Sequence, residues 1–86
     1  MPNIRQQKKR VRTADRQRAE NIRYRSTVRT LTRKLRDAAA EGDQDATQAA
    51  HRDLVRWLDR SVTRGALHRN TAARRKAQAA KLVAAD

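Results

Sequence analysis

The 86-residue chain carries 22 lysine and arginine residues against nine aspartate and glutamate residues, so its formal net charge is +13. A charge of this size indicates an anionic partner, of which nucleic acid is the commonest. The absence of cysteine excludes a disulfide framework and a thiolate metal site. No apolar run is long enough for a signal-peptide core or a membrane span, so we expect neither secretion nor membrane insertion.

The basic residues are concentrated near the start of the chain. Residues 5–36 hold thirteen of them, opposed only by Asp15 and Glu20. We expect residues 1–10 to form a basic arm that is disordered in the free protein, because cations are disfavoured at the positive end of a helix dipole. Residues 11–41 are predicted to form one helix, since no glycine or proline interrupts them before Gly42.

Apolar residues become regular only in the second half of this helix. At 100° per residue, Tyr24, Val28, Leu31 and Leu35 form one stripe, with a row of arginines beside it. The first half has too few apolar residues to pack, so we expect it to project beyond the rest of the fold. The predicted arginine row consists of Arg18, Arg25, Arg29, Arg33 and Arg36.

A short break separates the first helix from a second one, predicted over residues 44–64. Gly42 suits a left-handed residue after a helix, and Asp43 suits the next N-cap. So short a loop places the two helices antiparallel. We expect one mixed-charge side of the second helix to face water, with Thr47 or Ser61 at the margin of the other side. That buried side is predicted to contain Ala50, Leu54, Trp57, Leu58 and Val62.

Gly65 ends the second helix, and a third is predicted over residues 70–83, capped by Asn70 or Thr71. Leu67 in the connector is a candidate core residue. Arginines crowd the first turns of the third helix, where cations are disfavoured, and such a conflict is typical of functional sites. Backbone N–H groups and arginines together would bind phosphate there. A predicted packing stripe of small residues comprises Ala73, Ala77, Ala80 and Ala84.

The predicted fold is therefore all-α, a three-helix bundle whose long basic first helix extends beyond the bundle. We expect no catalytic residue, metal site, cofactor or small-molecule substrate, because His51 and His68 are the only histidines and no Gly-rich loop is present. Trp57 and Tyr24 fit the core, although Trp57 could stack on a base and the Tyr24 hydroxyl could contact phosphate. His68 could form a hydrogen bond within its connector or contact nucleic acid.

Seventeen of the basic residues are arginine, whose planar fork binds phosphate through two hydrogen bonds. Scarce aromatic residues argue against base stacking, and no zinc-finger spacing is present. This chemistry favours many phosphate contacts on folded RNA. The alternative is a nucleoid-type, non-specific DNA-binding protein, which competition between ribosomal RNA and duplex DNA would distinguish. A membrane-surface helix would need an apolar face along residues 5–23, and that face is missing.

Several short motifs occur in order along the chain. The first group contains Asn3, Ile4, Arg5, Lys8, Lys9 and Arg10. The central group contains Asn21, Arg25, Ser26, Arg29, Thr30, Arg33, Lys34, Gly42 and Asp43. The last group contains Gly65, Leu67, His68, Arg69, Asn70, Ala72, Ala73, Arg74 and Lys76. Over essentially its whole length, the chain thereby resembles the bacterial small-subunit ribosomal protein family S-twenty.

The resemblance implies a three-helix bundle that is a structural constituent of the small ribosomal subunit and binds 16S rRNA directly and early in assembly. It also implies contacts with the 5′ domain and the long 3′ minor-domain helix, a monomer within the ribosome, and a cytoplasmic location. The chain departs from the family pattern at Pro2, Gln6, Gln7 and Tyr24.

Charge and resemblance together select the residues that we predict to bind RNA. They are Lys8, Lys9, Arg10, Arg12, Arg16, Arg18, Arg23, Arg25, Ser26, Arg29, Arg33, Lys34, His68, Arg69, Asn70, Arg74, Arg75 and Lys76.

Overall fold

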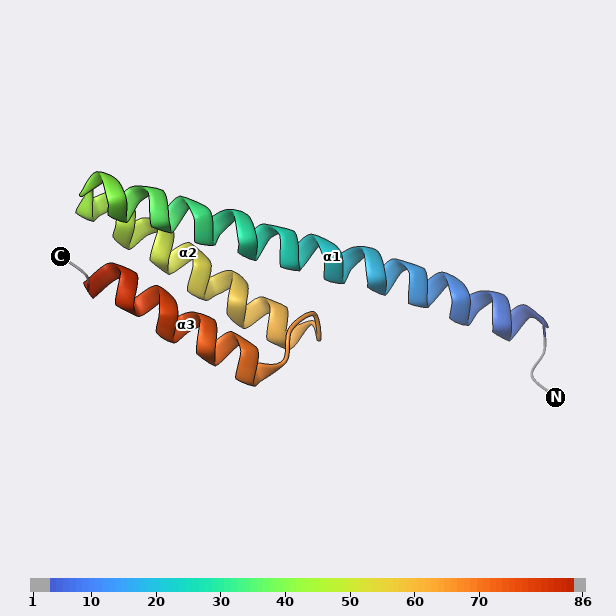
Figure 1. Ribbon diagram of the computed structural model, residues 1–86. Helices are drawn as coiled ribbons and strands as arrows, with labels where there is room; N and C mark the ends of the chain where they lie inside the picture. Colours follow the sequence, from blue (N-terminus) through green and yellow to red (C-terminus); the bar gives the residue numbers. More distant parts are fainter. Residues whose placement is uncertain (1–3, 85–86) are drawn as a thin grey trace.

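The computed structural model describes residues 4–84, and three α-helices account for most of them. Helix α1 spans Ile4–Glu41, α2 spans Gln44–Thr63 and α3 spans Arg69–Ala84 (Figure 1). No strand occurs within residues 4–84, so the all-α prediction is confirmed. The Cα radius of gyration is 17.1 Å, with principal extents of 62 × 20 × 13 Å. A compact chain of this length would have a radius of about 12 Å, so the molecule is elongated.

Helix α1 begins at Ile4 and not at residue 11, so residues 4–10 of the predicted arm are part of this helix. Residues 1–3 of that arm lie outside the described residues. Arginine, lysine and glutamine fill all six of positions 5–10 and are good helix formers. Their long side chains all extend into water, where charge repulsion is weakened by solvent and salt. Helices α2 and α3 begin and end within one residue of their predicted limits.

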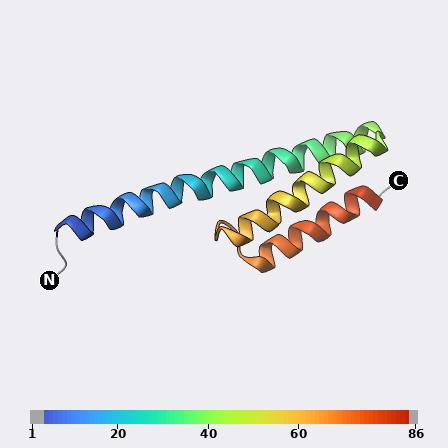
Figure 2. The same ribbon diagram turned by 180° about the vertical axis from the view of Figure 1, so that it is seen from behind.

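The first half of α1 leaves the bundle, as predicted. Figures 1 and 2 show α1 continuing alone past the connector between α2 and α3. We call residues 4–23 the α1 extension. Its few large apolar side chains are exposed: Val11 by 60% and Ile22 by 58%. The extension therefore has no hydrophobic packing of its own to hold it in a helix.

We expect the backbone amides of the α1 extension to exchange hydrogen rapidly in the free protein. A helix of about twenty residues without tertiary contacts is marginal in water, and like charges three or four residues apart weaken it further. Amides near Val28 and Leu35, both buried, should exchange much more slowly. Hydrogen exchange followed by mass spectrometry, with and without 16S rRNA, measures this. Equal exchange in both halves of α1 would contradict it.

A glycine follows the C-terminal end of α1, and another follows that of α2. Gly42 has φ = 75° and Gly65 has φ = 76°, a region that side chains with a Cβ rarely adopt. After α1, the N–H of Gly42 donates to Ala39 O at 3.2 Å, and after α2 the N–H of Gly65 donates to Val62 O at 3.0 Å. The Asp43 carboxylate then accepts from the Ala46 N–H at 3.1 Å, which confirms it as the N-cap of α2.

The core is a thin layer of side chains between the three helices. Leu35 of α1 and Leu58 of α2 are fully buried. Thr47 and Ser61 are also buried, so their prediction as marginal residues is corrected. Their hydroxyls donate to the carbonyl oxygens four residues earlier, at 2.6 and 2.7 Å, which satisfies these buried polar groups. The buried core cluster comprises Val28, Leu35, Leu54, Leu58, Ala72 and Ala79.

Helix α3 packs through a different face from the one predicted. Ala72 and Ala79 are buried, and Leu82 and Val83 pack against the core beside them. This face buries more apolar area than a stripe of alanines can, because Leu82 and Val83 are larger. In the connector, Ala66 is buried and Leu67 is half-buried against the core cluster. The predicted packing stripe is exposed at all four positions, Ala73, Ala77, Ala80 and Ala84.

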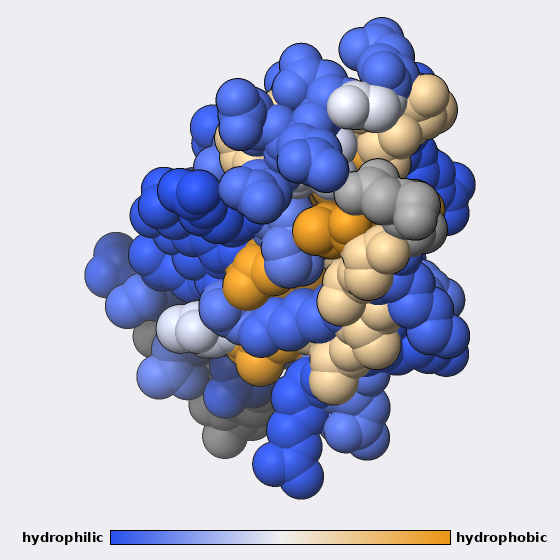
Figure 3. Space-filling view, turned by 90° about the vertical axis from the view of Figure 1, so that its left-hand side faces the viewer, coloured by the Kyte–Doolittle hydropathy of each residue, from blue (hydrophilic) through white to orange (hydrophobic). Residues whose placement is uncertain are grey.

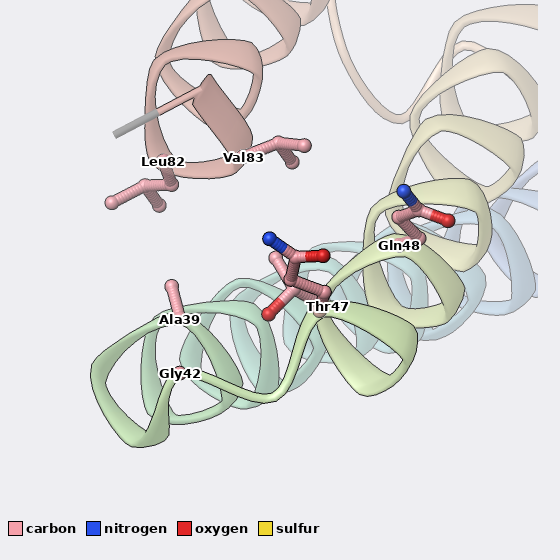
Figure 4. Close-up of a pocket in the computed structure, with 7 residues that line it drawn as sticks. Ala39, Gly42, Thr47, Gln48, Leu82 and Val83 are labelled. Atoms are coloured by element: carbon pink, nitrogen blue, oxygen red, sulfur yellow. The ribbon is translucent and has the colours of Figure 1, made fainter. Parts of the chain in front are cut away.

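The bundle has two distinct ends. At the turn end, the α1–α2 turn meets the C-terminal part of α3; at the junction end, α1 leaves the bundle beside the α2–α3 connector (Figure 1). Figure 3 views the turn end, where a few hydrophobic side chains reach the surface among hydrophilic ones. A cavity of about 120 Å³ opens there, with Leu82 and Val83 facing Ala39, Thr47 and Gln48 (Figure 4).

Candidate nucleic-acid interface

Charge is distributed along the length of the molecule. The α1 extension has eight basic residues against Asp15 and Glu20. The junction end, residues 24–32 and 54–76, has nine basic residues against Asp59 alone. At the turn end, residues 33–53 and 77–84, five basic and five acidic residues balance. The positive field therefore covers the α1 extension and the junction end.

The cations of the α1 extension are all exposed, and many of them face one side. At 100° per residue, Arg12, Arg16 and Arg23 lie within about 40° of one another. The predicted row that includes Arg25 and Arg29 lies roughly 120° around the helix from them. Helix α1 thus presents two separate rows of arginine, so it can contact polyanion on two sides at once.

A cleft between α1 and α3 gathers several predicted RNA-binding residues at the junction end. It has a volume of about 400 Å³, and its lining includes Arg25 and Arg29 from α1 and His68 and Arg75 from the other side. The Arg25 Nε–H donates to the carbonyl oxygen of Ala66 at 3.2 Å. Arg25 therefore joins α1 to the α2–α3 connector, in addition to lining the cleft.

His68 marks the start of α3, which corrects the predicted cap at Asn70 or Thr71. The N–H of Asn70 donates to His68 Nδ1 at 3.1 Å, and the N–H of Ala72 donates to His68 O at 3.1 Å. Helix α3 already includes Arg69 and Asn70, so neither predicted cap precedes it. The local hydrogen bond considered for His68 is present, while its side chain remains exposed.

The remaining predicted residues are not all gathered in the cleft. Lys76 forms an ion pair with Asp59 of α2, so its charge is partly neutralised. Arg33 and Lys34 lie at the turn end and are exposed, and Ser26 is exposed on α1. Exposed residues Arg69, Asn70 and Arg74 lie in the first turns of α3, near the cleft in sequence but not in its lining.

The residues predicted to bind RNA do not include three arginines at the C-terminal end of α2. Arg56, Arg60 and Arg64 line a second groove with Tyr24 of α1. Their spacing of four residues places them in one row, which was the signal in the sequence that could have revealed them. Tyr24 and Trp57 are both half-buried, with ring centroids 5.5 Å apart and planes tilted by 57°.

Within residues 4–84, no group of three or more histidine, cysteine, aspartate or glutamate side chains is placed to hold a metal ion. None of the helices in the same range is both long enough and apolar enough to cross a membrane.

The sequence matches the family described as Ribosomal protein S20 over residues 2–84. The chain belongs to the ribosomal protein S20 family. It is 44% identical, over 98% of each chain, to the small ribosomal subunit protein bS20 of Kocuria rhizophila. It is 49% identical to the bS20 protein of Corynebacterium diphtheriae, over 93% of this chain and 92% of that one. The bS20 protein of Shouchella clausii is 41% identical, over 94% and 92% respectively.

Membership of the S20 family confirms the resemblance inferred from the short motifs. The matched range includes all of the helical bundle and the α1 extension. Every residue that we predicted to bind RNA therefore lies within the part of the chain that is similar to the family.

Arg25→Lys should separate the effect of the Arg25 hydrogen bond to the connector from the effect of its charge. Lysine keeps the positive charge but has no Nε–H to donate to Ala66 O, so we expect the free energy of unfolding to fall by about 1 kcal/mol. Arg29→Lys, in which no such hydrogen bond is lost, should change it by less than about 0.5 kcal/mol. Urea unfolding followed by circular dichroism measures both variants, and equal values would argue against the contact.

Proposed function

We propose that this chain is a structural constituent of the small ribosomal subunit that binds 16S rRNA directly through phosphate contacts and helps the RNA to assemble. The observation that supports this most is the continuous positive surface over the α1 extension and the junction end, in a chain of the S20 family. Arginine predominates on that surface and suits bidentate phosphate contacts. This function would place the chain on the ribosome in the cytoplasm, as a monomer and without catalytic activity.

The α1 extension suits a position between two RNA elements. Arg12, Arg16 and Arg23 face one side of it, whereas Arg10 and Arg18 each lie about 120° or more away from them around the helix. The extension is also too poor in apolar residues to pack on protein. An extended helix with cations on two sides can neutralise phosphates of two neighbouring RNA helices. We propose that these elements are the 5′ domain and the long 3′ minor-domain helix of 16S rRNA.

The cleft between α1 and α3 supplies a second kind of contact. Arg29 and Arg75 come from different helices and line the same space, so they can hold one phosphate group between them. Arg69 and Arg74 add positive charge to the first turns of α3, near backbone N–H groups at the helix start. This cleft is a candidate site for one turn of the RNA backbone.

Hydroxyl-radical footprinting of 16S rRNA tests the proposed function. The purified full chain should protect defined segments of the 5′ domain and the 3′ minor-domain helix at moderate salt. Binding should weaken with salt, with a log–log slope of about 0.7–0.9 per neutralised phosphate. A duplex DNA of equal length is the control competitor. Equal competition by that DNA, or equal protection of unrelated RNA, would favour a nucleoid-type DNA-binding protein instead.

A further inference from the structure

A row of arginines at the C-terminal end of α2 takes part in none of the RNA contacts proposed above. Arg56, Arg60 and Arg64 follow one another at four-residue intervals and are all exposed. Together with Tyr24 of α1 they line an open groove of about 630 Å³. Tyr24 is half-buried and directly follows the α1 extension, where α1 begins to pack on α2. The groove therefore continues the positive surface of the extension onto α2.

These three arginines lack carboxylate partners within the described residues. Arg56 and Arg60, and likewise Arg60 and Arg64, are like charges four residues apart, a spacing that destabilises a helix. Asp59 is the only acidic residue that lines the groove, and it pairs with Lys76 of α3. The row therefore keeps a surplus of positive charge, which an anionic partner would neutralise.

An aromatic pair positions the middle arginine of the row. The Arg60 Cζ lies 5.6 Å from the centroid of the Trp57 ring, and Trp57 in turn contacts Tyr24. A guanidinium held against an aromatic ring keeps the N–H groups on its edge free to donate hydrogen bonds. Arg60 is thus restrained before it binds, which lowers the entropy lost when it contacts a phosphate.

We propose that Arg56, Arg60 and Arg64 form, with Tyr24, a third RNA-binding surface that holds the sugar–phosphate backbone of 16S rRNA against α2. This proposal rests on the proposed function and adds α2, whose exposed side was expected only to face water. RNA is favoured over an acidic protein because the groove joins the arginine-rich α1 extension, and a polyanion can follow both surfaces. The bundle would then be contacted by RNA at α2 as well as in the cleft between α1 and α3.

The decisive variant is Arg56→Gln, Arg60→Gln and Arg64→Gln combined. Its matched control is Arg52→Gln, Lys81→Gln and Gln48→Glu, which lowers the net charge by the same three units at exposed positions of the turn end outside the arginine row of α1. If each arginine of the row contacts one phosphate, the salt slope should fall by about 2–3 and the affinity for 16S rRNA at 0.1 M salt by roughly 100- to 500-fold. The control should lose much less. Footprinting should show one protected RNA segment lost and the segments bound by the α1 extension retained.

Trp57 provides an independent signal, because it is the only tryptophan and lies against Arg60. Its fluorescence should change when 16S rRNA binds the unmodified chain, and this change should disappear in the groove variant. Circular dichroism confirms that both variants remain helical. A groove variant that matches the control in affinity, salt slope and footprint would overturn the proposal. Normal RNA affinity with impaired incorporation into the subunit would also overturn it, in favour of a protein partner.

The two failures are distinguishable. If the unmodified chain does not protect 16S rRNA, the proposed function itself fails. If the unmodified chain protects 16S rRNA but the groove variant binds it as the control variant does, the proposed function stands. The α2 surface is then excluded from RNA binding.

Discussion

Replacing Arg18, Arg29 and Arg33 together by glutamate is expected to reduce the affinity for 16S rRNA by more than about 500-fold at 0.1 M salt. Removing three phosphate contacts alone accounts for roughly 100- to 500-fold, and the new carboxylates add repulsion. All three side chains are exposed on α1, and glutamate is a good helix former, so the helix content should be unchanged. Filter binding across a salt series, with circular dichroism of the free variants, measures both effects.

Arg25 is excluded from that variant because its hydrogen bond to Ala66 O would confuse a loss of binding with a loss of structure. The matched control changes Arg52, Lys81, Gln48 and Gln78 to glutamate, which makes the same change in net charge at exposed positions of the turn end outside that row. Similar losses in the two variants would show that the total charge matters and that the row on α1 does not. Unfolding of the α1 variant alone would assign the row a structural role.

Leu58→Ala should have the largest effect on stability. Leu58 is fully buried in a core of few large side chains, and such a truncation costs about 2–5 kcal/mol. A chain of this size has a total stability of roughly 4–13 kcal/mol, and its thin core places this bundle towards the lower end. We therefore expect the free variant to be largely unfolded at 37 °C and its urea transition to lose most of its amplitude.

Ile22→Ala is the control for this substitution, since Ile22 is 58% exposed on the α1 extension. It should change the free energy of unfolding by less than about 0.5 kcal/mol. Excess 16S rRNA should restore helical signal to the Leu58→Ala variant, because binding to the folded form shifts the folding equilibrium. A cooperative urea transition of the Leu58→Ala variant at the same midpoint as that of the unmodified chain would show that Leu58 is not part of a continuous core.

The sequence predicted the helices well because their limits depend on local chemistry. Gly42, Asp43 and Gly65 each act within a few residues, through positive φ or a capping carboxylate. The arginine row of α1 followed equally from helical periodicity. Family membership was also predictable, since the ordered motifs extend over the whole chain.

Packing between distant segments was harder to predict. The alanine stripe of α3 and the face with Ala72 and Ala79 have similar periodicity, and only the fit against α1 and α2 selects between them. The Arg25 contact with Ala66 joins residues 41 positions apart, so no local pattern reveals it. The start of α1 was misjudged because dipole repulsion was given more weight than the helix propensity of residues 4–10.

The mixed-charge side of α2 is exposed, as predicted, but its charges are not evenly distributed along the helix. Residues 37–59 are acidic in total, yet the charge of α2 changes sign along its length. Asp45 and Asp53 lie towards its start, whereas Arg56, Arg60 and Arg64 lie towards its end. Because α1 and α2 are antiparallel, these arginines come to the end of the bundle where α1 leaves it (Figure 1).

That α1 is one unbroken helix affects the order of events on RNA. Starting a helix in a separate peptide is unfavourable by a factor of about 10⁻³, equivalent to roughly 4 kcal/mol, whereas adding a residue to an existing helix is nearly neutral. The packed turns around Val28 already provide that first turn. The bundle thus acts as a nucleus from which helix can grow from residue 23 towards residue 4, along whatever phosphates the exposed arginines meet.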